Sequence, residues 1–191
     1  EIARHVDMII TCLPNPEAST AVMEADDGIL AGLTPGKLWA EMSTTDEMEV
    51  RRLGQQVIDK GAEPIDCPVS GGCHRATTGN ISIFVGTERP TFDKAFPVIQ
   101  AMGRQILHTG PLGSASILKV VTNYLASVNL VAIGEAMMTA HRAGVDLSTT
   151  YEAIRISSGN SFVHETEGQV ILNGSRDINF TLDLVVKDMT L

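Results

Sequence analysis

The sequence predicts an α/β layer with a largely parallel sheet, joined by one long helix to an all-α domain. Over the first 110 residues or so, short apolar runs alternate with amphipathic stretches, as strands alternate with helices in such layers. From Ser114 to about Ala143 no proline interrupts a helical pattern of about 29 residues. Beyond Gly144 the pattern is helical as well. We therefore place a domain boundary near 110–114 and treat 1–112 and 113–191 as two domains.

The strands of the first domain are predicted from apolar runs that turn signals bound. A helix should begin at Pro16, with Asn15 as its N-cap. Thr44 and Glu47 have the spacing of a capping box for a second helix. The predicted strands are Val6–Cys12, Lys37–Glu41, Ile65–Cys67, Ile81–Val85 and Gln105–His108, and the further helices run from about 47 to Gly61 and over Pro90–Met102.

The C-terminal part should contain several helices. Thr149 and Glu152 have capping-box spacing before a helix predicted over Tyr151–Ser157. The last residues, LDLVVKDMTL, are expected to be helical, and the pattern stops without a helix-ending residue. No GxGxxG follows any predicted strand, so a dinucleotide pyrophosphate loop is missing. We expect this stretch to belong to a longer protein and to be inactive by itself.

Composition excludes several kinds of partner. The 191 residues carry a net charge of −9, with an isoelectric point near 4.9 and no basic cluster. This argues against nucleic acid and anionic membranes as partners. We expect no membrane span, because no apolar run reaches about 18 residues. Three cysteines without paired spacing indicate reduced thiols in a cytoplasmic protein, and no metal-ligand spacing is present.

Lys119 and Asn123 are candidate functional residues in the segment GPLGSASILKVVTN. Residues four apart share one helix face, so the ammonium and the carboxamide should point the same way. The helix dipole should lower the pKa of a lysine near a helix start, which suits it to proton transfer near neutral pH. A solvated surface lysine and a solvated asparagine are the alternative interpretation.

Ser70, Gly71 and Gly72 form a candidate anion site. They follow the end of a predicted strand, where open α/β sheets bind ligands. Glycines leave backbone N–H groups uncovered, and a turn of such groups can hold a carboxylate. An ordinary strand-to-loop turn is the alternative. The sequence PVSGG does not match the GxSxG of serine hydrolases.

Five segments in order resemble the β-hydroxyacid dehydrogenase family, whose type members include 3-hydroxyisobutyrate dehydrogenase and the tartronate and succinic semialdehyde reductases. The segments are VDMIITCLPN, EMSTT, DCPVSGG, GPLGSASILKVVTN and NFTLDLVVKDMTL, and they cover essentially the whole chain. Two departures are visible: Ala115 replaces a glycine of the lysine motif, and Met189 replaces a leucine near the end. The resemblance implies a partial Rossmann-like sheet that is followed by a helical domain like that of 6-phosphogluconate dehydrogenase.

The resemblance also implies roles for individual residues. Lys119 would be the catalytic acid and base, and Asn123 would orient the substrate. The substrate motif would be Ser70, Gly71 and Gly72. The residues implied at the cofactor are Leu13, Pro14, Thr44, Phe180, Lys187 and Asp188.

The expected function is hydride transfer between NAD or NADP and a short β-hydroxyacid or its semialdehyde, such as 3-hydroxyisobutyrate. Two alternatives stay open: a non-catalytic binding module, and a related reductase of imines or larger acids. The long helix has aliphatic faces, and together with the resemblance it suggests a homo-oligomer, either a dimer or a tetramer. The acidic or basic residue that selects between NAD and NADP lies outside this sequence.

Overall fold

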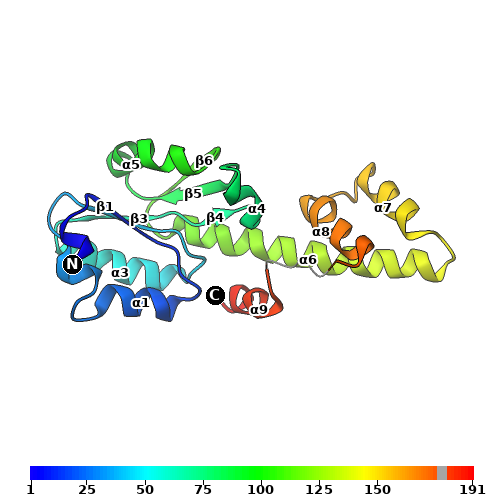
Figure 1. Ribbon diagram of the computed structural model, residues 1–191, viewed down its shortest axis with the longest axis horizontal. Helices are drawn as coiled ribbons and strands as arrows, with labels where there is room; N and C mark the ends of the chain where they lie inside the picture. Colours follow the sequence, from blue (N-terminus) through cyan, green and yellow to red (C-terminus); the bar gives the residue numbers. More distant parts are fainter. Residues whose placement is uncertain (176–179) are drawn as a thin grey trace. The chain divides into compact units, whose positions relative to one another are not determined.

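The computed structural model describes residues 1–175 and 180–191, which form two compact units. The first comprises Glu1–Val121 and Val186–Leu191, and the second comprises Thr122–Val185. The first unit contains a six-stranded sheet with flanking helices, and the second is helical (Figure 1). The predicted fold class, a Rossmann-like α/β sheet followed by a helical domain, is confirmed.

The sheet is mixed, with its strands in the order β1 (Met8–Thr11), β2 (Leu38–Glu41), β3 (Glu63–Asp66), β5 (Ser82–Gly86) and β4 (Val69–Ser70). β6 (Gln105–Gly110) also pairs with β5. β1, β2 and β3 are mutually parallel, as are β5 and β6. β5 runs antiparallel to both β3 and β4, so the sheet is less uniformly parallel than the sequence predicts.

All three helices predicted before residue 110 occur, but one predicted cap is wrong. The helices before α6 are α1 (Pro16–Glu24), α2 (Ile29–Gly32), α3 (Glu47–Asp59), α4 (Gly72–Thr77) and α5 (Arg89–Met102). Asn15 caps α1 as predicted, since its Oδ1 accepts a hydrogen bond from the Ala18 N–H at 2.9 Å. Asp46 caps α3 in place of Thr44, because its carboxylate reaches the Glu49 N–H at 3.0 Å.

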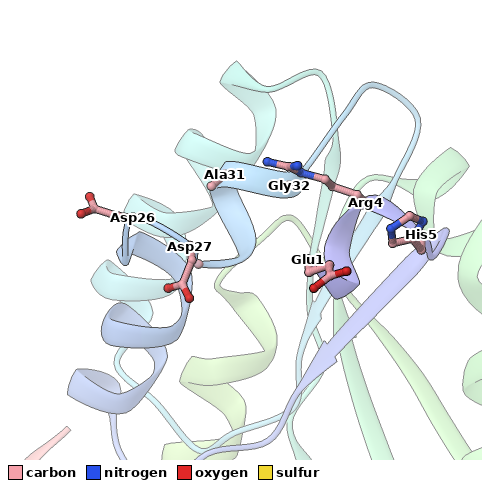
Figure 2. Close-up of a pocket in the computed structure, with 8 residues that line it drawn as sticks. Glu1, Arg4, His5, Asp26, Asp27, Ala31 and Gly32 are labelled. Atoms are coloured by element: carbon pink, nitrogen blue, oxygen red, sulfur yellow. The ribbon is translucent and has the colours of Figure 1, made fainter.

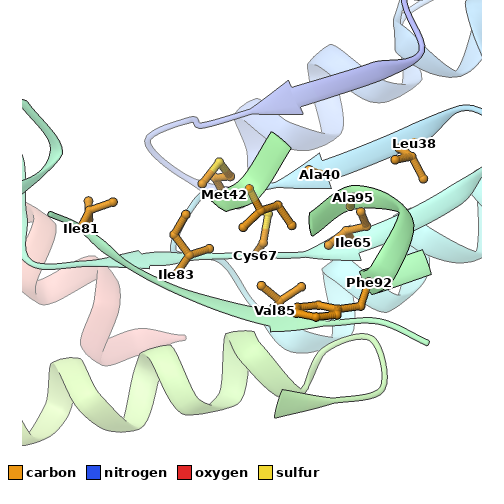
Figure 3. Close-up of a cluster of buried hydrophobic side chains, with 11 residues drawn as sticks. Leu38, Ala40, Met42, Ile65, Cys67, Ile81, Ile83, Val85, Phe92 and Ala95 are labelled. Atoms are coloured by element: carbon orange, nitrogen blue, oxygen red, sulfur yellow. The ribbon is translucent and has the colours of Figure 1, made fainter. Parts of the chain in front are cut away.

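Each face of the sheet packs against its own helices, because successive strand residues point to opposite sides. On one face Leu38 and Ala40 pack with Phe92 and Ile99 of α5 (Figure 3). Trp39, which lies between them in sequence, points to the other face and packs with residues of α1 and α3. The second cluster comprises Met23, Leu33, Trp39, Leu53, Val57 and Ala62. This alternation holds the carboxyl ends of the strands in place.

The long helix α6 (Ser114–Arg142) agrees closely with its predicted range, and α7 (Leu147–Arg155), α8 (Phe162–Asn173) and α9 (Leu182–Thr190) follow. Asp146 caps α7, so the predicted cap at Thr149 is wrong; Thr149 instead donates its N–H to the Asp146 carboxylate at 2.9 Å. In the second unit Ile133, Met137 and Tyr151 form a small core.

Helix α6 is long and apolar enough to cross a membrane, by length and composition only. Only 11% of its most apolar stretch is buried. Contrary to our expectation from the sequence, one helix is therefore long enough to cross a membrane. Core helices of globular proteins have the same length and composition, so this observation alone assigns no span.

Candidate active site

Lys119 is a buried ammonium in the second turn of α6. Its side chain is 7% exposed, and burial lowers its pKa to about 8. The Asp188 carboxylate opposes that shift, and the Lys187 ammonium adds to it. The predicted direction of the pKa shift is confirmed, but its cause differs from the prediction. Because α6 begins at Ser114, Lys119 lies beyond the first turn, and desolvation rather than the helix dipole is the main cause.

The end of α9 brings two more predicted residues close to this lysine. Lys187 Nζ lies 2.7 Å from Asp188 Oδ1 and donates a hydrogen bond to the Thr44 carbonyl oxygen at 2.9 Å. Asp188 is 3% exposed. The structure therefore gathers Thr44, Lys119, Lys187 and Asp188 from three separate segments of the first unit. A buried carboxylate beside two ammonium groups partly balances their charge.

A second group of residues lies where the parallel strands β1 and β2 end. The Leu13 N–H donates to Ser43 Oγ at 2.7 Å, and the Ser43 N–H donates to Glu41 Oε1 at 2.9 Å. Glu41 is 1% exposed and also accepts a hydrogen bond from Thr11 at 3.1 Å. These bonds tie the two strand ends together and leave Pro14 exposed beside Leu13. Open α/β sheets bind dinucleotides at this kind of edge.

The Ser70–Gly72 segment has an unusual backbone. Gly71 and Gly72 have φ values of 130° and 75°, in the region that side chains disfavour. Gly71 precedes α4, a short helix that the sequence does not predict. A Cβ atom on Gly71 would lie 2.7 Å from Arg75 Cδ. The glycines are therefore required by the local geometry, and a carboxylate-binding role for this turn stays a prediction.

The remaining two predicted residues belong to the second unit. Asn123 lies on α6, and its carbonyl oxygen accepts a hydrogen bond from Ser127 Oγ at 2.9 Å. Phe180 precedes α9 and is 47% exposed. Their proposed contacts with substrate and cofactor stay predictions.

The sequence interpretation missed two buried carboxylates, Glu41 and Asp66. Asp66 is fully buried at the end of β3, where Oδ2 accepts from the Ser116 N–H and Oδ1 from Ser116 Oγ, both at 2.8 Å. The sequence did contain a signal for both carboxylates, because Asp66 is the first residue of the DCPVSGG segment and Glu41 is the first residue of EMSTT. Each is an acidic residue that directly follows buried strand residues, which is unfavourable unless it has fixed partners.

A hollow of about 390 Å³ lies elsewhere in the first unit, near its first residues (Figure 2). Its lining includes Glu1, Arg4, His5, Asp26 and Asp27. None of the predicted site residues lines it. The charged groups around it are exposed, and we assign it no role.

In a comparison with known proteins, each of the two parts of the chain matches a protein-family model. Residues 1–110 match the family model described as the NAD binding domain of 6-phosphogluconate dehydrogenase. Residues 113–191 match the model described as NAD-binding of NADP-dependent 3-hydroxyisobutyrate dehydrogenase. The fold and these matches define an NAD(P)-binding domain of the Rossmann-like class with its helical companion.

Individual relatives agree with these matches. The chain is 33% identical over its full length to an NAD-dependent L-serine dehydrogenase of Pseudomonas aeruginosa and 31% identical to a 2-(hydroxymethyl)glutarate dehydrogenase of Eubacterium barkeri. It spans 66% and 64% of those proteins. A solved structure of Mycobacterium tuberculosis 3-hydroxyisobutyrate dehydrogenase with L-serine aligns with a TM-score of 0.88 and 27% identity, over 97% of this chain and 65% of that one.

The chain belongs to the β-hydroxyacid dehydrogenase family. The cofactor of this class is NAD or NADP.

Proposed function

We propose that the complete protein is an NAD(P)-dependent oxidoreductase that interconverts a short β-hydroxyacid and its semialdehyde. One observation supports this most strongly: Lys119 is buried beside Asp188 and has a pKa of about 8. A buried ammonium that releases its proton near neutral pH is suited to general acid and base catalysis. The names of the relatives support hydroxyacids as the substrate class.

When bound, NAD or NADP would supply or accept a hydride at the substrate carbon. In the reductive direction, negative charge develops on the carbonyl oxygen, and the Lys119 ammonium stabilises that charge and donates a proton. In the oxidative direction, the neutral Lys119 amine accepts the alcohol proton. Asn123 orients the substrate, and the Ser70–Gly72 turn holds its carboxylate through backbone N–H groups.

We propose that residues at the ends of β1 and β2 would hold the cofactor. Pro14 is exposed there and Thr44 is half-buried, so both residues have surface that a ligand could reach. The other residues that we propose at the cofactor are Leu13, Phe180, Lys187 and Asp188. Lys187 donates a hydrogen bond to the carbonyl oxygen of Thr44, which lies three residues beyond the end of β2, and this contact supports its inclusion in the group.

The proposal is tested by assaying the complete protein with NAD and with NADP on 3-hydroxyisobutyrate, L-serine and L-threonate, while following absorbance of the reduced nicotinamide. Oxidation of one of these acids is expected. Turnover of cyclic imines but of none of the acids would favour an imine reductase. Cofactor binding without any turnover would favour the binding-module alternative.

The pH dependence should follow the ionisation of Lys119. Because the amine must be neutral to accept a proton, kcat for oxidation of 3-hydroxyisobutyrate should rise as pH increases through about 8. Reduction needs the ammonium, so its kcat should fall over the same range. Steady-state rates in both directions between pH 6 and 10 check this. Parallel pH profiles in the two directions would contradict the role of Lys119.

We also propose that residues 1–112 and 113–191 act as two domains and that the protein is a homo-oligomer. In the second unit α6 exposes a set of large apolar side chains: Tyr124, Leu125, Val128, Val131 and Met138. A hollow of about 330 Å³ lies beside Val128, Val131 and Glu135. Exposed apolar surface of this kind is typical of a subunit interface.

Replacing Val131 with glutamate should shift the complete protein towards monomer, because a charge would be buried in the proposed interface. Sedimentation velocity measures the assembly state. Ser148→Glu is the matched control, since it adds the same charge at an exposed position of α7. A wild-type protein that sediments as a monomer would disprove the proposal.

The cytoplasmic location stays a prediction. It rests on the three cysteines, Cys12, Cys67 and Cys73, which are free thiols in the structure.

A further inference from the structure

The start of α6 is fixed to the sheet through one carboxylate. Asp66, the last residue of β3, receives two hydrogen bonds of 2.8 Å from Ser116, one from the backbone N–H and one from the hydroxyl. Its side chain is completely buried, and Ser116 is 1% exposed. The Ala115 N–H also interacts favourably with this carboxylate. A buried carboxylate therefore satisfies the N–H groups that a helix leaves without partners in its first turn.

Lys119 follows Ser116 by three residues, which is less than one helical turn. The position of the first turn therefore determines where the lysine ammonium lies. Ala115 and Ser116 are packed tightly, and a Cβ atom on Gly86 would lie 3.1 Å from the Ala115 nitrogen. A helix held both by packing and by a charge-assisted pair of hydrogen bonds has little freedom to rotate or slide.

We propose that Asp66 is a positioning residue, which fixes the first turn of α6 and thereby directs Lys119 to the substrate oxygen. This inference rests on the proposed function. Asp66 itself exchanges no proton with the substrate. Its contribution depends on its negative charge, because the ionised carboxylate accepts from both Ser116 groups whereas the protonated acid keeps full acceptor strength on one oxygen only.

Asp66 ionises in a pH range in which enzyme activity can be assayed. Burial raises its pKa to about 6, while the Ser116 and Ala115 groups hold the pKa down and the Glu41 carboxylate raises it further. The titratable groups around it are Glu41 on β2 and Cys67, the residue that follows β3, and Lys119 lies further along α6. Burial keeps the pKa of the Cys67 thiol well above its usual value, so Cys67 stays neutral in this range.

The first test uses Asp66→Asn in the complete protein, with kcat measured for reduction of 2-hydroxy-3-oxopropionate between pH 5 and 9. In the wild type, kcat should fall below about pH 6 as Asp66 gains a proton and above about pH 8 as Lys119 loses one. Asparagine resembles the protonated acid, because only its carbonyl oxygen accepts. The variant should therefore have about tenfold lower kcat at pH 7, a nearly unchanged KM for the aldehyde, and no fall below pH 6.

The second test does not depend on turnover. The pKa of Lys119 is measured by NMR titration of ¹⁵N-labelled lysine in the wild type and in Asp66→Asn. If the first turn of α6 moves, the ammonium gains contact with water and its pKa should rise from about 8 towards the ordinary value. A role confined to stability would leave the Lys119 pKa unchanged.

Two further variants keep the test interpretable. Ser116→Ala removes one donor and should move the fall at low pH to a higher pH, because that hydrogen bond stabilises the Asp66 carboxylate. It is also the substitute if Asp66→Asn does not fold. Asp146→Asn is the matched control: it alters an aspartate that accepts from the Thr149 N–H at the start of α7, and it should leave kcat and the Lys119 pKa unchanged.

The outcomes separate this inference from the proposed function. A fall in kcat below pH 6 that persists in Asp66→Asn, together with an unchanged Lys119 pKa, would overturn the positioning role. Absence of the fall above pH 8 in the wild type would instead refute Lys119 as the proton donor. Loss of the low-pH fall and a raised Lys119 pKa in Asp66→Asn, together with a fall above pH 8 in the wild type, would support both.

Discussion

Lys119→Ala in the complete protein is expected to lower kcat for 3-hydroxyisobutyrate by at least ~100-fold, the usual scale for loss of a proton-transfer group. The physical reason is that the neighbouring ammonium of Lys187 has other partners. In the described residues of the first unit, the nearby Lys187 is already paired with Asp188 and bonded to the Thr44 carbonyl. Steady-state kinetics measure the loss, and circular dichroism and thermal unfolding check that the fold is retained.

The matched control for that variant is Lys60→Ala, which removes an exposed lysine at the end of α3. It should leave kcat within about twofold of the wild type, as surface substitutions usually change little. If Lys119→Ala retained its kcat with an unchanged fold, Lys119 would not be the acid and base.

Gly71→Val is expected to raise the KM for hydroxyacids by at least ~10-fold while the Kd of the cofactor changes little, because loss of hydrogen bonds to a charged carboxylate has an effect of about that size. Gly71 has a φ of 130°, and its Cβ position lies against Arg75 Cδ. A side chain there must shift the Ser70–Gly72 turn that we propose for the substrate carboxylate. Kinetics with 3-hydroxyisobutyrate give the KM, and fluorescence titration gives the cofactor Kd.

Gly79→Val is the matched control, since Gly79 also has a positive φ, of 67°, but has no atom within 4 Å of its Cβ position among the described residues. Both variants introduce backbone strain, and only Gly71→Val should change the KM. Equal losses of substrate and cofactor affinity in Gly71→Val would show that the turn serves the cofactor as well. Equal KM changes in the two variants would mean that strain alone is the cause.

Local signals predicted the elements of this fold well where one signal was dominant. The Asn15–Pro16 pair marked the start of α1, and the proline-free run marked α6. Capping boxes were less reliable. At α3 and α7 a neighbouring aspartate, Asp46 or Asp146, caps the helix instead, because several polar residues compete at a helix start and backbone geometry selects one. Helix α4 has too few residues to carry a periodic pattern.

The sequence by itself determined the family and the order of the motifs, because each motif is a run of consecutive residues with its own chemistry. It also indicated Lys119, through its four-residue spacing from Asn123 near the start of a long helix. Only the tertiary structure decided what surrounds that lysine. Lys187 and Asp188 come from the end of the chain and Thr44 from its first quarter, and Asp66 reaches Ser116 across fifty residues of sequence. Burial, which lowers the Lys119 pKa and raises that of Asp66, is a property of the packed molecule, and no local pattern of residues encodes it.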